Sequence, residues 1–232
     1  GPHGLRKQDA AHGADMLGVN ESRPSTCFPT AVTLADSWDT ELLAELGAAL
    51  GEEAAAMGVG LVLGPGVNIK RDPLCGRNFE YFSEDPCLAG KLAAAHIAGL
   101  QKNGVSASLK HFACNNQESC RFTSDSVMDT RTLREMYLPA FETAVNEARP
   151  GTVMCAYNQL NGVHCSDNQP LLTKILREEW GFEGAVLTDW GAMSDRIEGF
   201  RAGCDLNMPG GSDYMEKEVL AAVRSGTLPE SA

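Results

Sequence analysis

Four short apolar runs recur along the chain, each followed or preceded by a segment with helical spacing of its apolar residues. The runs that we expect to form strands are Val59–Leu63, Val105–Leu109, Thr152–Asn158 and Ala185–Leu187. Regular alternation of strand and helix predicts a parallel sheet with helices packed outside it. The spacing suits an α/β fold of the (β/α)8 barrel type, and no repeat or linker divides the 232 residues into more than one domain.

The helices that this pattern predicts lie between the strands and after them. They span about 40–57, 87–102, 132–148, 170–180, 195–202 and 214–224. Thr132 and Glu135 have the spacing of a capping box, and Pro139 is expected to kink the helix that follows. The long polar segments 70–87 and 113–131 are predicted loops, and loops of that length in a compact domain usually serve function.

Charge and hydropathy exclude some classes of partner. The net charge is −12, which argues against nucleic acid and against anionic membrane surfaces as partners but does not exclude a neutral substrate. No apolar run approaches the ~18 residues that span a bilayer. Hydrophobic residues make up 43% of the chain, which is enough for a substantial core.

The eight cysteines are scattered and include no CxxC pair. In a chain of this length they are better interpreted as reduced, small hydrophobic residues than as a disulfide framework. They favour a cytoplasmic location, while an extracellular one stays open. A metal site built from His111, Cys114 and Cys120 is a weaker alternative, because zinc ligands usually have tighter, paired spacing.

Three predicted strands end in polar side chains. These ends are Lys110-His111, Tyr157-Asn158 and Asp189-Trp190. In a barrel the carboxyl ends of the strands converge on one face, where the chemistry of such folds is found. A carboxylate nucleophile there needs neighbouring cations that lower its pKa, and the same donors suit sugar hydroxyls.

Each of these residues also has a purely structural interpretation. Asp189 alone could cap a helix, and Lys110-His111 could be a satisfied polar pair at a strand end. Arg71 alone is typical of a solvated loop charge, and Met154 and Tyr157 are typical of core packing. The joint pattern favours a site.

At this point the sequence resembles the β-glucosidases of glycoside hydrolase family 3 over nearly its whole length and in order. The segments that carry the resemblance are Gly1-Pro-His-Gly-Leu-Arg6, the stretch from Asn68 to Pro86 containing Lys-Arg-Asp-Pro-Leu-Cys-Gly-Arg-Asn-Phe-Glu-Tyr-Phe-Ser-Glu-Asp, Lys110-His-Phe-Ala-Cys-Asn-Asn-Gln-Glu118, Val153-Met-Cys-Ala-Tyr-Asn158 and Leu187-Thr-Asp-Trp-Gly191.

The resemblance implies a role for each candidate residue. Asp189 would be the nucleophile of a retaining, exo-acting β-glucosidase that needs no metal or organic cofactor. The residues that match positions around the bound glucosyl unit are Arg71, Lys110, His111, Arg121 and Tyr157. Trp190 matches the wall of the adjoining subsite, and Met154 is a weaker contact candidate. The implied partner is a small saccharide or β-glucoside.

The sequence departs from the family's pattern in two ways. An Asp precedes the Gly-Pro-His-Gly-Leu-Arg stretch in the family, whereas this sequence starts at Gly1, so we expect a native Gly1 and a missing first strand. The family's acid/base Glu lies in a second α/β domain. Residues 1–232 are therefore expected to be an incomplete (β/α)8 TIM-like barrel, truncated at both ends, nearly inactive alone and prone to self-association unless the missing C-terminal domain or another chain completes it.

Alternatives stay open within and outside this family. A single-domain branch, the β-N-acetylglucosaminidases, uses an acid/base His, but residues 113–131 contain none. A β-xylosidase or another β-glycosidase of the family fits the same motifs. A non-catalytic sugar-binding barrel is the alternative from another class, although Asp189 is present. A metal-dependent hydrolase is disfavoured by the spacing of the five histidines.

Overall fold

The computed structural model describes residues 3–8, 22–210 and 213–230 of the chain. Its centre is a parallel sheet of four strands: β1 (Leu61–Val62), β2 (Ser106–Phe112), β4 (Thr152–Cys155) and β7 (Ala185–Thr188). The strands lie in the order β1-β2-β4-β7, so each is hydrogen-bonded to the next one along the chain. This is the strand order of a (β/α)8 barrel. Gly1 and Pro2, where the predicted N-terminal motif begins, lie outside the described residues.

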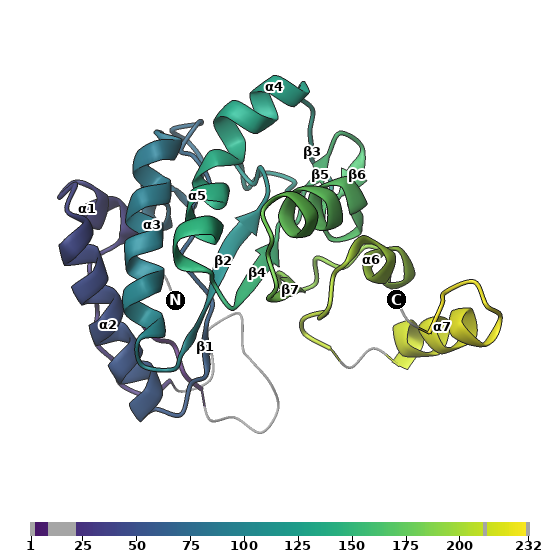
Figure 1. Cartoon of the computed structure of the whole chain (residues 1–232), viewed down its shortest axis with the longest axis horizontal. Coiled ribbons are helices and arrows are strands. Elements are labelled where there is room, and N and C mark those ends of the chain that lie inside the picture. The colour runs from purple at the N-terminus through teal and green to yellow at the C-terminus, as the bar shows by residue number, and fades with distance from the viewer. Residues whose placement is uncertain (1–2, 9–21, 211–212, 231–232) are drawn as a thin grey trace.

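A helix connects each strand of this sheet to the next. α3 (Pro86–Gln101) follows β1, α5 (Pro139–Ala148) follows β2, and the π-helix η4 (Pro170–Glu179) follows β4. Figure 1 shows α2 (Thr40–Ala56), α3 and α5 side by side against the sheet. The described part of the sheet does not close on itself. The structure thus confirms the predicted α/β fold, an incomplete (β/α)8 TIM-like barrel.

The core fills the layer between the sheet and these helices. Leu92, Ile97 and Leu100 of α3 and Leu109 of β2 are fully buried there. Asp39 and Asp85 begin α2 and α3, because each side chain accepts hydrogen bonds from two backbone N–H groups of the first turn. The two helices also approach closely, since a Cβ on Gly47 would lie 2.2 Å from the carbonyl oxygen of His96.

Three strand predictions need correction, and one of them is Thr152–Asn158, of which only Thr152–Cys155 forms a strand. Of Val59–Leu63, only Leu61–Val62 forms a strand, because this is the segment that pairs with β2. β2 extends beyond Leu109 to Phe112, so Lys110 and His111 lie within the strand rather than after it. The pairing of β2 with β4 is irregular between Leu109 and Phe112. The backbone of Lys110 bonds instead to Pro65 and Val67 of the loop after β1.

The helix predicted over 132–148 is divided into three parts. α4 (Thr130–Thr132) is followed by the π-helical turn η2 (Leu133–Tyr137) and then by α5, which begins at Pro139. The predicted capping box is wrong, because Asp129 caps the first turn by accepting a hydrogen bond from the N–H of Thr132 at 2.6 Å. Glu135 forms an ion pair with Arg131 instead.

The remaining elements are short, apart from the C-terminal helix. β3 (Asp125–Ser126), β5 (Gln159–Leu160) and β6 (Val163–His164) form a small second sheet, and β3 lies in the predicted loop 113–131. Two others are α1 (Ala31–Ala35) and the 3-10 turn η3 (Cys165–Asp167). α6 (Arg196–Ala202) leads to α7 (Asp213–Arg224), which stands at the far end of the molecule in Figure 1.

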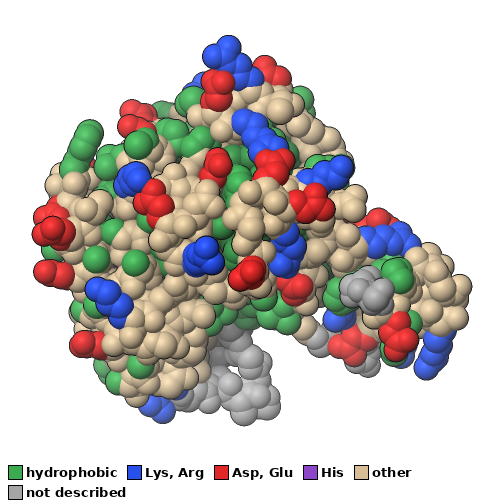
Figure 2. Space-filling model, in the orientation of Figure 1, with side chains coloured by type: hydrophobic (Ala, Val, Ile, Leu, Met, Phe, Trp, Pro, Cys, Tyr) green, Lys and Arg blue, Asp and Glu red, His purple; other side chains and the backbone are tan. Residues whose placement is uncertain are grey.

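The visible surface carries charges of both signs, and the cysteines form no disulfide. Figure 2 shows acidic and basic side chains interspersed over the visible face. All eight cysteines are free, and five of them, including Cys155 and Cys204, are buried. Within the described residues, no helix is both long enough and apolar enough to cross a membrane.

Candidate active site

Asp189 directly follows β7 at the carboxyl end of the central sheet. Its side chain is 16% exposed, and its Oδ1 accepts a hydrogen bond from the backbone N–H of Trp190 at 2.7 Å. The helix that follows, α6, begins seven residues later and is capped by Asp195. Asp189 is therefore not a helix cap, and its other oxygen faces a cluster of donors.

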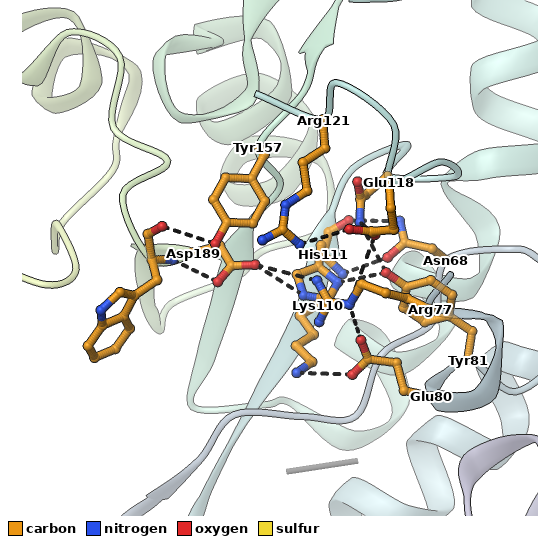
Figure 3. Close-up of polar contacts among 12 residues, drawn as sticks. Asn68, Arg77, Glu80, Tyr81, Lys110, His111, Glu118, Arg121, Tyr157 and Asp189 are labelled. Atoms are coloured by element: carbon orange, nitrogen blue, oxygen red, sulfur yellow. Dashed lines mark hydrogen bonds and ion pairs between the residues drawn. The ribbon is translucent and has the colours of Figure 1, made fainter. Parts of the chain in front are cut away.

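Two donors approach Oδ2 of Asp189 from different elements. His111 Nε2, in β2, lies 3.3 Å away, and Arg77 Nη1, in the loop before the 3-10 turn η1 (Asn78–Glu80), lies 3.8 Å away. The His111 contact is not aligned as a hydrogen bond, and Nε2 has no hydrogen-bond partner among the described residues. Figure 3 shows both side chains converging on Asp189.

The backbone of His111 is held by a buried amide. Asn68 Oδ1 accepts from the His111 N–H at 2.8 Å, and Asn68 Nδ2 donates to the His111 carbonyl at 2.9 Å. Asn68 lies in the loop after β1, so this loop is joined to β2 through one side chain. This paired contact fixes the place of the imidazole at the strand end.

The surroundings keep Asp189 ionised and His111 neutral. Burial raises the pKa of Asp189, but contact with His111, the Trp190 N–H and the charge of Arg77 together hold that pKa well below its usual range. Burial lowers the pKa of His111 to about 4; contact with Asp189 opposes this shift, and the charges of Arg77 and Lys110 add smaller decreases. At neutral pH the site thus presents a carboxylate beside an uncharged imidazole.

Glu80 is the counter-charge to two cations of the site. It is buried, it forms an ion pair with Arg77, and its Oε2 lies 3.4 Å from Lys110 Nζ. Burial raises the pKa of Glu80, but the charges of Lys110 and Arg77 together lower it by more, so the net shift is downward. Lys110 is 11% exposed, and its ammonium is thereby held at the carboxyl end of β2.

Arg121 and Tyr157 pack against each other on another side of the site. The guanidinium carbon of Arg121 lies 4.2 Å from the centre of the Tyr157 ring, and Arg121 Nη1 pairs with Glu118 at 2.8 Å. The Phe122 ring packs edge-on against Tyr157 at 4.5 Å. The Tyr157 hydroxyl donates to the Trp190 carbonyl at 3.0 Å, and burial together with the charge of Asp189 raises its pKa. Tyr157 therefore stays protonated.

The structure brings most of the predicted residues together. Asp189, Lys110, His111, Arg121, Tyr157 and Trp190 lie at or beside this cluster. Met154 is 2% exposed within β4, opposite Leu187 of β7. Arg71 is exposed in the loop after β1, and no described ion pair joins it to Asp189. The guanidinium that reaches Asp189 belongs to Arg77.

Sequence reasoning missed several polar residues of the cluster. These are Asn68, Arg77, Glu80, Tyr81, Asn115 and Glu118. Three of them lie in the predicted loop 70–87 and two in the predicted loop 113–131, and the sequence marks both loops as functional without ranking their members. In the described ranges, no group of three or more His, Cys, Asp or Glu side chains is placed to hold a metal ion.

Comparison with known proteins decides the family. The model of the glycosyl hydrolase family 3 N-terminal domain matches residues 7–232. The chain belongs to glycosyl hydrolase family 3. The resemblance inferred from the motifs is thereby confirmed.

Relatives within family 3 are similar over the whole chain. Thermostable β-glucosidase B of Acetivibrio thermocellus is 57% identical over 231 residues, which is 100% of this chain and 30% of that protein. An exo-α-(1→6)-L-arabinopyranosidase of Bifidobacterium breve is 51% identical over 98% of this chain and 30% of its own length. The chain thus spans about a third of the length of these curated relatives.

Solved family 3 structures share the fold. β-Glucosidase 3B from Thermotoga neapolitana, in complex with α-D-glucose, has a TM-score of 0.92 and 45% identity, and the match covers 100% of this chain and 33% of that one. A β-glucosidase from Kluyveromyces marxianus in complex with glucose has a TM-score of 0.90 and 38% identity, over 98% and 26% of the two chains.

Proposed function

We propose that this chain is the nucleophile-bearing part of a retaining, exo-acting β-glucosidase. The observation that carries the proposal is Asp189: an ionised, largely buried carboxylate at a strand end, with one oxygen held by the Trp190 N–H and the other turned toward His111 and Arg77. The relatives named β-glucosidases support the substrate class.

In the proposed reaction, Asp189 Oδ2 attacks the anomeric carbon of a terminal β-D-glucosyl unit. The bond to the aglycone oxygen breaks, a carboxylic acid protonates that oxygen, and a covalent glycosyl-enzyme forms with inverted configuration. Water, deprotonated by the same acid/base group, then attacks the anomeric carbon and releases glucose with net retention. The low pKa of Asp189 suits it to both attack and departure.

The substrate donors are already in place around this carboxylate. Lys110 and Arg121 only donate, Nε2 of His111 has no partner among the described residues, and sugar hydroxyl oxygens accept. Trp190 offers an apolar ring beside Asp189 on which a sugar face can stack. We assign Arg77 to the same group of donors, since it lies 3.8 Å from Asp189.

We propose that the acid/base comes from outside these 232 residues. A general acid needs a raised pKa, whereas the buried Glu80 beside the site has its pKa lowered by Lys110 and Arg77. The chain covers about 30% of the length of its relatives, so most of their length has no counterpart among these residues. Its turnover alone is then expected to be low by about 10²–10⁴-fold, the usual contribution of proton transfer.

Asp189→Asn in the complete gene product tests the proposal. We expect turnover of an aryl β-glucoside to be abolished, and mass spectrometry after reaction with a 2-fluoro β-glucoside to place the label on Asp189 of the unaltered protein. Asp195→Asn is the matched control, since Asn caps α6 as well as Asp does. A label on another carboxylate would refute the assignment.

A second candidate activity is that of an α-L-arabinopyranosidase. Two relatives, at 51% and 50% identity, carry that name. Comparing kcat/KM for aryl β-glucoside, β-xyloside and α-L-arabinopyranoside separates the candidates, because the last two sugars lack the hydroxymethyl group. We expect the β-glucoside to be preferred. Glucose binding without any turnover in the complete protein would favour a sugar-binding barrel.

A further inference from the structure

A line of hydrogen bonds runs from Glu118 to the imidazole beside Asp189. Asn115 Nδ2 lies 3.1 Å from Glu118 Oε1 and 3.2 Å from the Tyr81 hydroxyl oxygen. The Tyr81 hydroxyl lies 3.0 Å from His111 Nδ1, and His111 Nε2 lies 3.3 Å from Asp189 Oδ2. Figure 3 shows Tyr81 and Glu118 on the side of His111 away from Asp189. Tyr81 and Asn115 are buried, so water does not replace these contacts.

The chemistry of the end groups gives this line a single direction. The Glu118 carboxylate is paired with Arg121 and only accepts, so the NH2 of Asn115, not its oxygen, faces it. The same NH2 donates to the Tyr81 oxygen. Tyr81 then has its own hydrogen left to donate, and His111 Nδ1 is the acceptor within reach.

The other tautomer of His111, with its hydrogen on Nδ1, is unfavourable at both ring nitrogens. If Nδ1 carried the hydrogen, the fully buried Tyr81 hydroxyl would accept twice and have no acceptor for its own hydrogen. The Nε2 lone pair would also face the Asp189 carboxylate at 3.3 Å. A buried polar group left unpaired is destabilising, and this arrangement leaves one on each side of His111.

We propose that Tyr81 is a positioning residue that holds neutral His111 in the Nε2–H tautomer. The N–H that results lies on the Asp189 side of the ring, where it can donate to a substrate hydroxyl. Asn115 and Glu118 act through Tyr81, because they set the direction in which its hydrogen points. The catalytic consequence rests on the proposed function, whereas the tautomer itself does not.

Neutron diffraction from deuterated crystals of the complete gene product at pH 7 tests the tautomer directly. We expect deuterium on Nε2 and not on Nδ1 of His111, with the Tyr81 deuteron pointing to Nδ1. Deuterium on Nδ1, or a Tyr81 deuteron that points elsewhere, would overturn the proposal. This measurement needs no turnover, so it stands even if Asp189 proves not to be the nucleophile.

Tyr81→Phe tests the consequence for catalysis. It removes one hydroxyl and keeps the ring, and we expect kcat/KM to fall by about tenfold to a hundredfold, as when other outer partners of a histidine are removed. The neutron map of the variant should then show deuterium on both ring nitrogens in partial occupancy. Tyr137→Phe, at a half-buried tyrosine outside the cluster, should leave both readings unchanged.

The two readings together separate the possible failures. A Tyr81→Phe protein that keeps a single Nε2–H tautomer and full activity would overturn the positioning role. A mixed tautomer with unchanged kcat/KM would contradict the catalytic part of the proposal while leaving the structural part intact. Loss of activity with the tautomer unchanged would show that Tyr81 acts in another way.

Discussion

Glu80 Oε2 lies 3.4 Å from Lys110 Nζ, and both groups are nearly excluded from solvent. The same carboxylate pairs with Nε of Arg77, and Nη1 of that guanidinium faces Asp189. Two cations and two carboxylates therefore balance at the end of the sheet, and the site carries no net formal charge. Glu80 therefore controls where both cations lie.

Glu80→Gln keeps the shape of the side chain and removes its charge. Because removing one partner of a buried charge pair typically costs about 3–5 kcal/mol, we expect the free energy of unfolding to fall by about that amount. We also expect KM for an aryl β-glucoside to rise, since Lys110 and Arg77 lose their common anchor. Urea denaturation and steady-state kinetics on the complete gene product measure the two effects.

Glu135→Gln is the matched control, because it makes the same change in an exposed pair. Glu135 lies 3.1 Å from Arg131, and both side chains are more than half exposed. Such pairs contribute about 0–1 kcal/mol, so little change is expected. Equal losses in the two variants would mean that the buried network around Glu80 has no special energetic weight.

Arg77 and Arg71 can be compared by the same substitution. Arg77→Lys shortens the reach to Asp189 and removes the planar fork that also pairs with Glu80, so we expect kcat/KM to fall by a factor of about ten or more. Arg71→Lys changes an exposed side chain and should have the smaller effect. Kinetics on both variants decide which guanidinium serves the substrate, and the opposite ranking would favour the role predicted from the sequence for Arg71.

The sheet was predictable because its signals are local. Apolar runs such as Val105–Leu109, and the helical segments between them, depend on neighbours in the sequence. The end of β2 was not predictable from the sequence. The backbone of Lys110 bonds to Pro65 and Val67 in the loop after the neighbouring strand β1, and no local pattern encodes that pairing. The capping box failed for a similar reason: Asp129 competes for the same N–H groups, and the sequence does not say which of two good caps is used.

The site was predictable where a residue ends a strand. Asp189, His111 and Tyr157 were found because they lie at or near the carboxyl ends of strands, which converge in this fold. Arg77 and Glu80 lie in a long loop, where the direction of a side chain depends on the path of the chain rather than on any period. The sequence therefore marked the loop after β1 as functional but did not distinguish Arg71 from Arg77.

The close packing of α2 on α3 makes Gly47 sensitive to one added carbon. A Cβ there would lie 2.2 Å from the His96 carbonyl oxygen, which belongs to the backbone and cannot turn away. We expect Gly47→Ala to lower the free energy of unfolding by about 1–3 kcal/mol, the usual cost of overpacking. Glu45→Ala, on the exposed face of the same helix, controls for helix propensity in urea denaturation. A more stable Gly47→Ala protein would show that the helices separate freely.

Two buried histidines predict how stability depends on pH. Burial lowers the pKa of His96 and of His111 to about 4, against an ordinary value of 6.5. Between pH 6.5 and pH 4 these histidines are protonated in the unfolded chain but neutral in the folded chain. The folded state therefore loses stability as the pH falls. Their contribution is complete above pH 6.5 and is lost progressively toward pH 4. The lowered pKa of Asp189 acts only below its ordinary value of 3.8, outside this window.

Urea denaturation between pH 7 and pH 5 measures this dependence. Because two histidines stay neutral in the folded chain and are protonated in the unfolded chain, the slope of the unfolding free energy against pH should approach about 2.7 kcal/mol per pH unit near pH 5. His96→Gln should halve that slope while leaving the Asp189 cluster in place, because His96 lies in α3 and its Nδ1 is buried without a partner. A slope near zero in the unaltered chain would mean that these imidazoles accept protons in the folded state, and His111 would then be a cation beside Asp189.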